Sequence, residues 1–178
     1  DKVSLWRGPG RGFARNFIAN VCNKALTAEF YAWCDQDDVW EPDKLQAAVS
    51  WLRSVPSEVP ALYFGRTELM SQHGDALGYS PLFRRPPSFA NALVQNIGGG
   101  NTMVLNHAAR VLLGEAGEQQ DVVSHDWWAY LLISAVGGNV FYDPTPHVHY
   151  RQHAGNLVGS NCGWGARATR IRMLLQGR

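Results

Sequence analysis

Residues 30–45 read FYAWCDQDDVWEPDKL and contain an apolar run, a group of acids and the start of a helix. The apolar and aromatic residues 30–33 predict a short buried strand. Pro42 suits the first turn of an amphipathic helix. The acids between the two elements are Asp35, Asp37 and Asp38. The sequence therefore predicts a cluster of carboxylates at the end of a buried strand.

Carboxylates this close repel one another and raise one another's pKa unless a cation lies between them. In an extended segment Asp35 and Asp37 are ~6.6 Å apart on one face, so a slight turn brings both toward one ion. Capping of the next helix would use one acid, not three. An EF-hand is excluded, because Trp40 and Gln46 stand where that loop needs glycine and glutamate. A divalent cation is the simplest interpretation.

Bulk composition excludes several classes of protein. The 178 residues are 46% hydrophobic, which suits one domain, and the net charge of +1 gives no sign of a nucleic-acid partner. The cysteines lack C-x-x-C spacing, which argues against a disulfide framework or zinc ribbon and favours a reducing, intracellular compartment. The most apolar stretch, 127–136, is too short to span a bilayer, and no signal peptide is visible at Asp1.

Other segments have both structural and functional interpretations. The glycine-rich residues 8–12 favour either a phosphate cradle or a flexible turn before a helix. Residues 96–102, NIGGGNT, leave the backbone open to a ligand or form a tight turn. Asp126 either complements the positive end of a helix or does chemistry. The spacing of His147, His149 and His153 suits zinc, but it lacks a fourth ligand nearby, and edge histidines are commoner.

Periodicity and punctuation predict the remaining elements. Within the helix that Pro42 opens, we expect Leu45, Val49 and Leu52 to form the buried face. A Gln-His-Gly-Asp turn at 72–75 indicates a hairpin or crossover, and Ser88 is a plausible helix cap. We expect helices at 13–25, 42–55, 88–95, 107–116 and 127–135, and strands at 61–70, 103–105 and 140–142.

Four motifs together resemble the family 2 glycosyltransferases, especially their rhamnosyltransferase-like branch. The acids and the following VWEPDKL are similar to the D-x-D signature and its next helix. Residues 12–16 are similar to a G-x-x-x-A-R-N segment, and the HDWW at 125–128 to a variant of the E-D motif. Residues 150–159 are similar to a Y-R-x-H-x-x-N-x-x-G ending. The likeness covers about residues 10–159.

The resemblance implies a GT-A-like α/β fold, with a mixed sheet flanked by helices. Residues 1–178 would be a single domain, the C-terminal two-thirds of a GT-A-type glycosyltransferase domain, because the family's usual N-terminal strands do not precede residue 8. A sheet without those strands has an open edge, which favours a homo-oligomer.

The same resemblance assigns roles to individual residues. Asp126 would be the catalytic base of an inverting transfer, and Asp37 with His153 would hold the metal. Oxygen-rich coordination favours Mn²⁺ or Mg²⁺. The residues expected to bind substrate or support the site are Arg15, Asn16, Asp35, Asp38, Gly99, Gly100, His125, Trp127 and Arg151. Arg15 has an alternative use, an ion pair with one of the acids at 35–38.

The implied donor is a nucleoside-diphosphate sugar, either dTDP-linked, with rhamnose as the first guess, or UDP-linked. The acceptor would be a glycan or a lipid-linked glycan. We expect a cytoplasmic protein, at the inner membrane surface if the basic residues 166–178 touch lipid instead of packing on the domain. Two other functions stay open: a glycoside hydrolase, which also uses paired acids, and a non-catalytic carbohydrate-binding or assembly module.

Overall fold

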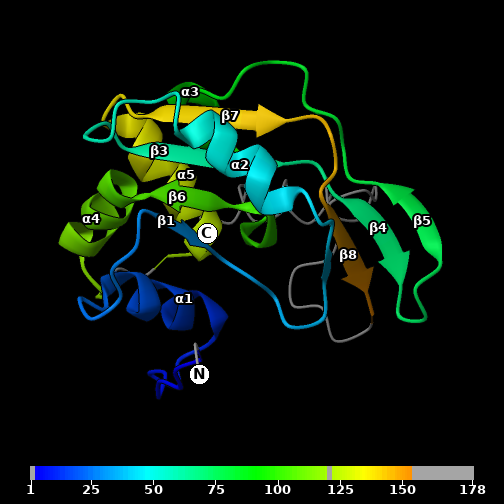
Figure 1. Ribbon diagram of the computed structural model, residues 1–178, viewed down its shortest axis with the longest axis horizontal. Helices are drawn as coiled ribbons and strands as arrows, with labels where there is room; N and C mark the ends of the chain where they lie inside the picture. The colour runs from blue at the N-terminus through cyan, green and yellow to red at the C-terminus, as the bar shows by residue number, and fades with distance from the viewer. Residues whose placement is uncertain (1–2, 120–121, 154–178) are drawn as a thin grey trace, which may run out of the picture.

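The computed structural model describes residues 3–119 and 122–153. In this part of the chain a central four-stranded sheet has the order β1-β6-β3-β7 (Figure 1). Its strands are β1 (Phe30–Ala32), β6 (Val104–Asn106), β3 (Ala61–Gly65) and β7 (Asn139–Asp143). The pair β3–β7 is parallel, and the pairs β1–β6 and β6–β3 are antiparallel. The expected mixed sheet in an α/β fold is therefore confirmed.

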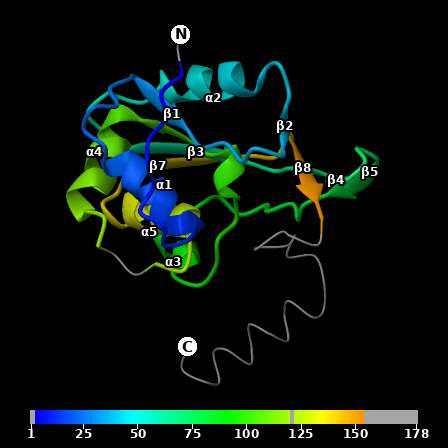
Figure 2. The ribbon, with the colours of Figure 1, turned by 90° about the horizontal axis from the view of Figure 1, so that it is seen from below.

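A second four-stranded sheet lies at one side of the first and has the order β2-β8-β4-β5 (Figure 2). Its strands are β2 (Val39–Trp40), β8 (Val148–Gln152), β4 (Glu68–Ser71) and β5 (Ala76–Tyr79). The strands β8 and β4 are parallel, whereas β2 and β5 pair antiparallel with their neighbours. The hairpin expected at the Gln-His-Gly-Asp turn is confirmed: it joins β4 to β5 and contains Gly74 at φ +95°.

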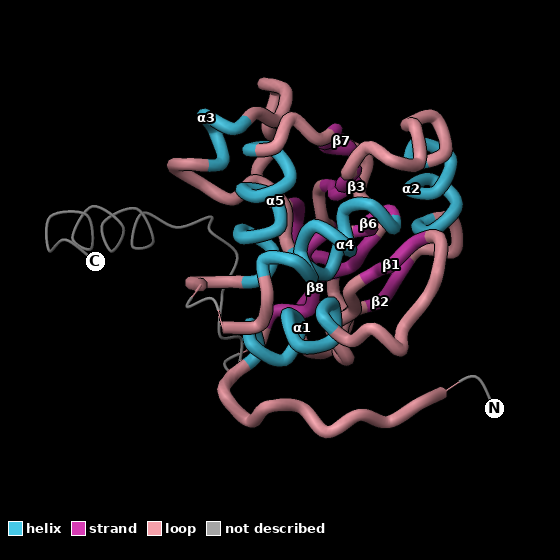
Figure 3. Tube along the Cα trace, turned by 90° about the vertical axis from the view of Figure 1, so that its left-hand side faces the viewer, coloured by secondary structure: helices cyan, strands magenta, loops and turns pink. Residues whose placement is uncertain are grey.

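Helices cover both faces of the central sheet (Figure 3). On one face, α2 (Lys44–Leu52) buries Ala48 and Leu52 against β3 and β6. The other face carries the larger core, in which Leu62 and Phe64 of β3 meet Tyr130 of α5. The helices on that face are α1 (Phe13–Cys22), α4 (His107–Ala116) and α5 (His125–Ala135), with the short α3 (Phe89–Ala92) beside α5. A 3-10 helix, η1 (Gly100–Thr102), precedes β6.

The strand expected at 61–70 is wrong as one element. The chain leaves the central sheet at Gly65 and enters the second sheet at Glu68. At the break, the Arg66 N–H donates to the Asp143 carbonyl (2.9 Å), and the guanidinium Nε donates to the Ser80 carbonyl (2.8 Å). The apolar pattern of residues 61–70 does not reveal that the chain passes from one sheet to the other, because residues before and after the break are both buried.

The buried face expected for the helix at 42–55 is also wrong in part. Leu45 is 45% exposed, whereas Lys44 is only 1% exposed and lies in line with the buried Ala48 and Leu52. The expected cap is confirmed at Ser88, whose side chain accepts from the Asn91 N–H. The helix expected at 107–116 begins and ends as predicted.

None of the helices among the described residues is long and apolar enough to cross a membrane. The basic segment 166–178, Cys162 and the end of the Y-R-x-H-x-x-N-x-x-G motif lie outside the described residues.

Candidate active site

The acids lie in the loop that carries the chain from the central sheet to the second one. Trp33, which is buried, follows β1, and the Trp33 N–H donates to the Met103 carbonyl (3.3 Å) beside β6. After the acids the chain pairs as β2 with β8. The loop is thus fastened to a different sheet at each end, and its carboxylates lie at the junction of the two sheets.

Asp37 meets the end of β8. The His153 Nε2 atom is 2.8 Å from Asp37 Oδ2, and the two side chains are 35% and 27% exposed. The guanidinium Nε of Arg151 donates to the Asp37 carbonyl (2.8 Å), and Nη1 donates to the Gln72 carbonyl (3.0 Å). The structure therefore brings together an imidazole and a carboxylate that are 116 residues apart, both partly open to solvent.

Asp38 is held from two sides. One of its oxygens accepts from the Arg151 backbone N–H (3.0 Å), and the other accepts from the Asn101 side-chain amide of η1. Burial raises the pKa of Asp38, and the hydrogen bonds from Asn101 and Arg151 oppose that rise. With both oxygens bonded to the protein, Asp38 supports the loop.

Asp126 lies in the first turn of α5, next to the glycine-rich turn. The Gly100 N–H donates to Asp126 Oδ2 (3.1 Å), and the Trp127 N–H donates to Asp126 Oδ1 (2.7 Å). An acid here also complements the positive end of the helix. The turn that carries Gly100 and Asn101 therefore holds Asp126 on one side and Asp38 on the other.

Asp35 shows that the acids share one electrostatic environment. Burial raises the pKa of Asp35 to about 6, with further contributions from the charges of Asp38, Asp37 and Asp126 and an opposing one from Lys44. Asp126 is thus near enough to the loop to disfavour a charge on Asp35.

Lys44 is a buried cation beneath the acids. Its Nζ donates to the Asn101 carbonyl (2.9 Å) and lies 3.3 Å from the centre of the Trp40 ring. Burial lowers the pKa of Lys44 to about 8, against the opposing charges of Cys34, Asp38 and Asp35. Below that pH the ammonium offsets part of the negative charge of the loop.

His125 is enclosed by aromatic rings and is 6% exposed. Phe17 stacks on its ring with centroids 4.2 Å apart, and Trp33 meets it edge-on at 4.6 Å. Burial lowers the pKa of His125 to about 4, although the charge of Asp126 opposes this, so the ring is neutral at pH 7. Neither ring nitrogen has a hydrogen-bond partner among the described residues.

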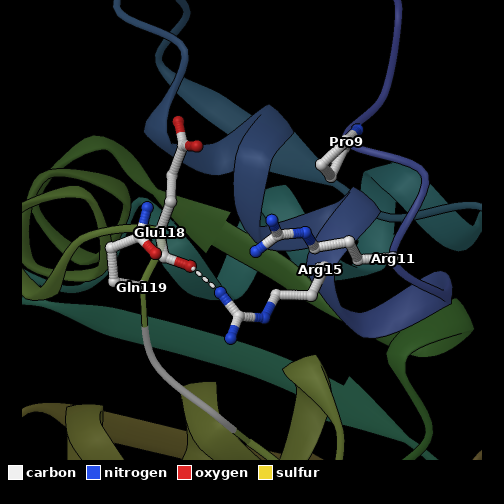
Figure 4. Close-up of a pocket in the computed structure, with 5 residues that line it drawn as sticks. All are labelled: Pro9, Arg11, Arg15, Glu118 and Gln119. Atoms are coloured by element: carbon white, nitrogen blue, oxygen red, sulfur yellow. Dashed lines mark hydrogen bonds between the residues drawn. The ribbon is translucent and has the colours of Figure 1, made fainter.

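Of the two predicted α1 residues, Arg15 lines a hollow of about 250 Å³. Figure 4 shows the guanidinium groups of Arg11 and Arg15 extending toward the chain at residues 118 and 119. Arg15 Nη1 donates to the Glu118 carbonyl (2.7 Å). Asn16 packs closely on Gly8 in the preceding loop, since a Cβ at Gly8 would lie 2.0 Å from Asn16 Oδ1.

Two further predicted residues have structural contacts. The Trp127 indole N–H donates to the Ala92 carbonyl of α3 (2.6 Å), so the ring fastens α5 to α3. The Gly99 carbonyl accepts from Thr102 Oγ1 (2.7 Å) and so closes the turn that precedes β6.

The zinc interpretation of the histidines fails for the residues that the structure describes. His147 lies 2.9 Å from Asp43 Oδ1, His149 lies against Glu41 and Glu68, and His153 pairs with Asp37. Each histidine thus has its own acids. Within residues 3–119 and 122–153, no group of three or more His, Cys, Asp or Glu side chains converges as a metal site.

Comparison with known proteins gives one relevant similarity. No family model matches the chain. It is 25% identical, over an alignment of 183 residues, to a dTDP-rhamnosyl transferase, RfbG, of Shigella flexneri. The alignment covers 97% of this chain and 58% of the relative, so the chain spans little more than half of that protein's length. The similarity, at low identity, is thus to a protein named as a glycosyltransferase.

Two residues of the site, Lys44 and Asn101, are not among those predicted. Both stand inside segments that the sequence singles out, VWEPDKL and NIGGGNT. A lysine at a helix start and an asparagine after glycines usually indicate solvent exposure and a turn. Lys44 and Asn101 meet through the bond from Lys44 Nζ to the Asn101 carbonyl, which joins positions 57 residues apart. No local sequence pattern predicts such a contact.

Replacing Asp35 by asparagine is expected to stabilise the protein at alkaline pH. The folded state holds the Asp35 proton more tightly than the unfolded chain, because its pKa is raised from 3.8 to about 6. Stability is therefore lost as the pH rises through this window, and an amide avoids the loss. After a discount for partial exposure we expect a gain of roughly 1–2 kcal/mol at pH 8 and less at pH 5, measured by urea unfolding.

The matched control for this experiment is Glu115→Gln on the exposed side of α4, which should leave the pH dependence unchanged. If Asp35→Asn is no more stable than the wild type at pH 8, burial and the neighbouring acids do not disfavour the Asp35 charge as inferred.

Proposed function

We propose that the chain is an inverting glycosyltransferase that moves a sugar from a nucleoside-diphosphate donor to a hydroxyl group of a glycan or lipid-linked acceptor. One observation carries the proposal: consecutive residues of the glycine-rich turn bind Asp126, through the Gly100 N–H, and Asp38, the neighbour of the Asp37–His153 pair, through the Asn101 amide. A transfer of this kind needs a group that stabilises a departing diphosphate and a base that removes the proton of the acceptor. This group of residues contains candidates for both roles.

The donor atoms of Asp37 and His153 fit a divalent cation of the Mn²⁺ or Mg²⁺ type. One carboxylate oxygen and one imidazole nitrogen, 2.8 Å apart and partly exposed, would hold the ion. The oxygens of the donor diphosphate and water would complete its coordination, since the described residues supply too few ligands for an all-protein site. When bound, such an ion supplies Lewis-acid stabilisation of the leaving diphosphate.

Asp126 acts as the base of the reaction. Each of its oxygens accepts one backbone N–H, from Gly100 or Trp127, and keeps a second lone pair for the proton of the acceptor hydroxyl. The two N–H groups fix the orientation of the carboxylate, so it needs no rearrangement during the reaction. A single attack assisted by one base inverts the anomeric carbon.

The neighbours of Asp126 support the base from the protein side. Gly100 is buried, and a Cβ there would lie 2.5 Å from His125 Nε2, so only a glycine leaves room for the His125 ring against this turn. The neutral His125 ring therefore packs under the turn and braces both Gly100 and Asp126. The free protein disfavours a charge on Asp35, so a cation, or a sugar hydroxyl that donates to its carboxylate, would stabilise that charge.

The finer assignments follow from the resemblance and from the similar protein. A mixed sheet with acids just beyond β1 is compatible with the GT-A fold. Because the similar protein is named as a dTDP-rhamnosyl transferase, dTDP-rhamnose is the first donor to test, followed by UDP-sugars. A lipid-linked acceptor would place the reaction at the cytoplasmic surface of the inner membrane.

Replacing Asp37 or His153 by alanine is expected to weaken Mn²⁺-dependent binding of dTDP at least about tenfold, because each side chain supplies one of two protein ligands. Calorimetric titration of dTDP and of UDP, each with and without Mn²⁺, measures the effect. Asp75→Ala in the β4–β5 turn is the matched control and should bind as the wild type does.

The possible outcomes separate the functions that the sequence leaves open. Equal, metal-independent binding by wild type and Asp37→Ala would contradict the role of Asp37. Metal-dependent binding without sugar transfer would favour a non-catalytic module. Hydrolysis of a glycoside without any affinity for nucleotide would favour a hydrolase.

A further inference from the structure

Residues 37–43 run antiparallel along β8, but few backbone contacts hold them there. The strand β2 has only two residues, with Val39 opposite His149 and Trp40 opposite Val148. One further bond, from the Glu41 N–H to the His147 carbonyl (3.0 Å), extends the pairing. A pairing this short specifies its register weakly, and a slip of one residue would turn every side chain to the opposite face.

Side chains extend the pairing far beyond these few bonds. His153 pairs with Asp37, His149 with Glu41 and His147 with Asp43, in the order that an antiparallel pairing requires. We call these three histidine–carboxylate pairs the histidine ladder. Its first pair is the proposed metal site, and its other two lie at increasing distance along the same loop.

The two remote histidines of the ladder also reach into the body of the protein. His149 Nδ1 lies 3.4 Å from Glu68 Oε2 on β4. His147 Nε2 lies 3.5 Å from Asp143 Oδ2 at the end of β7, and that carboxylate also accepts from the Tyr63 hydroxyl of β3 (2.6 Å). Each histidine therefore bridges the acidic loop to a strand that belongs to one of the two sheets.

The two histidines are more buried than their partners in the loop. The His147 and His149 side chains are 13% and 29% exposed, and their inner partners Asp143 and Glu68 are 16% and 27% exposed, whereas the loop carboxylates Asp43 and Glu41 are 67% and 41% exposed. Exposed pairs are weakened by water and salt, and partly buried pairs are screened much less, so the inner contacts hold the imidazoles in place for the loop carboxylates to meet. Together with the bonds from Arg151 to Asp37 and Asp38, the ladder can fix a register that two paired residues alone cannot.

We propose that His147 and His149 are positioning residues, which hold the acidic loop in the one register on β8 that brings Asp37 to His153. This inference rests on the proposed function, because Asp37 and His153 matter as a pair only if they bind the donor with its metal. His147 and His149 themselves contact neither the proposed metal position nor Asp126 in any described interaction.

The test compares His149→Ala, which removes the bridge, with His149→Gln, whose amide can still donate to Glu41. In the full chain, NMR amide exchange of Glu41 and Arg151 reports the register, since these N–H groups bond to the His147 carbonyl and to Asp38. We expect roughly tenfold faster exchange at both amides in the alanine variant and recovery in the glutamine variant. Mn²⁺-dependent affinity for dTDP should fall roughly tenfold and recover in parallel.

His73→Ala is the control, because His73 lies in the exposed β4–β5 turn and should change neither readout. If His149→Ala does not fold, Glu41→Ala removes the same imidazole–carboxylate contact and should speed exchange at the same amides. Unchanged exchange in these variants overturns the inference whether or not dTDP binds, and so does faster exchange with unchanged affinity. Failure of the wild type to bind dTDP with Mn²⁺ would instead reject the proposed function, while the exchange data still decide the register.

Discussion

Asp126→Asn should transfer sugar about 10³-fold more slowly than the wild type and bind the donor equally well, because general base catalysis typically contributes 10²–10⁴-fold. The amide has the size of the carboxylate, and its oxygen can still accept the Gly100 N–H that holds Asp126 at 3.1 Å, although the bond from the Trp127 N–H is lost. It cannot take a proton from the acceptor. The loss should therefore appear in turnover rather than in affinity for the donor.

The measurement is release of nucleoside diphosphate from dTDP-rhamnose, or from a UDP-sugar, in the presence of a glycan acceptor and Mn²⁺. Affinity for dTDP with Mn²⁺ is measured on the same protein and should stay within about twofold, since Asp126 lies outside the Asp37–His153 pair. Glu115→Gln controls for the loss of a carboxylate elsewhere. Full turnover by Asp126→Asn would show that another group is the base.

Local patterns predict well those elements whose signals are local. The helix α4 begins after Asn106, whose side chain accepts from the Ala109 N–H, and its bounds follow from the periodicity of residues 107–116. The turn at Gly74 is equally local, because a glycine at positive φ closes a tight hairpin. In both cases the interactions that determine the element lie within a few consecutive residues.

Patterns fail where a polar side chain has a distant partner. Lys44 occupies a core position of α2, and an amphipathic pattern treats any lysine as exposed. Its ammonium is tolerated inside because it reaches the Asn101 carbonyl and the face of Trp40. Similarly, the division of residues 61–70 between two sheets depends on bonds from Arg66 to Asp143 and Ser80, which only the folded chain brings near.

The residues of the candidate site were predicted from a family resemblance and not from local patterns. Asp37, Asp126 and His153 come from three distant segments, and no spacing rule connects them. The resemblance to a family selected them, and the structure brings Asp37 to His153 and connects Asp126 to Asp38 through the glycine-rich turn. The remainder of the histidine ladder belongs to no motif, because its pairs follow from the register of β2 on β8.

Gly98→Ala is expected to destabilise the protein by about 3 kcal/mol, near the upper end of the usual range for an overpacked core. A Cβ at Gly98 would lie 2.4 Å from Cδ2 and 2.7 Å from Cγ of Phe64. The Phe64 ring is fully buried and meets Tyr130 edge-on at 5.4 Å, so it cannot move aside without displacing α5. Either the ring or the glycine-rich turn must shift.

The same substitution at Gly114 of α4 is the matched control. Nothing lies within 4 Å of a Cβ built there, so Gly114→Ala should stabilise the helix by roughly 0.5–1 kcal/mol. Urea unfolding of both variants measures the contrast. If Gly98→Ala is as stable as the wild type, the turn yields instead of the core, and the Gly100 N–H that orients Asp126 must move with it. Transfer by such a variant should then be impaired at normal stability, so the two measurements together decide whether the core or the turn is the rigid partner.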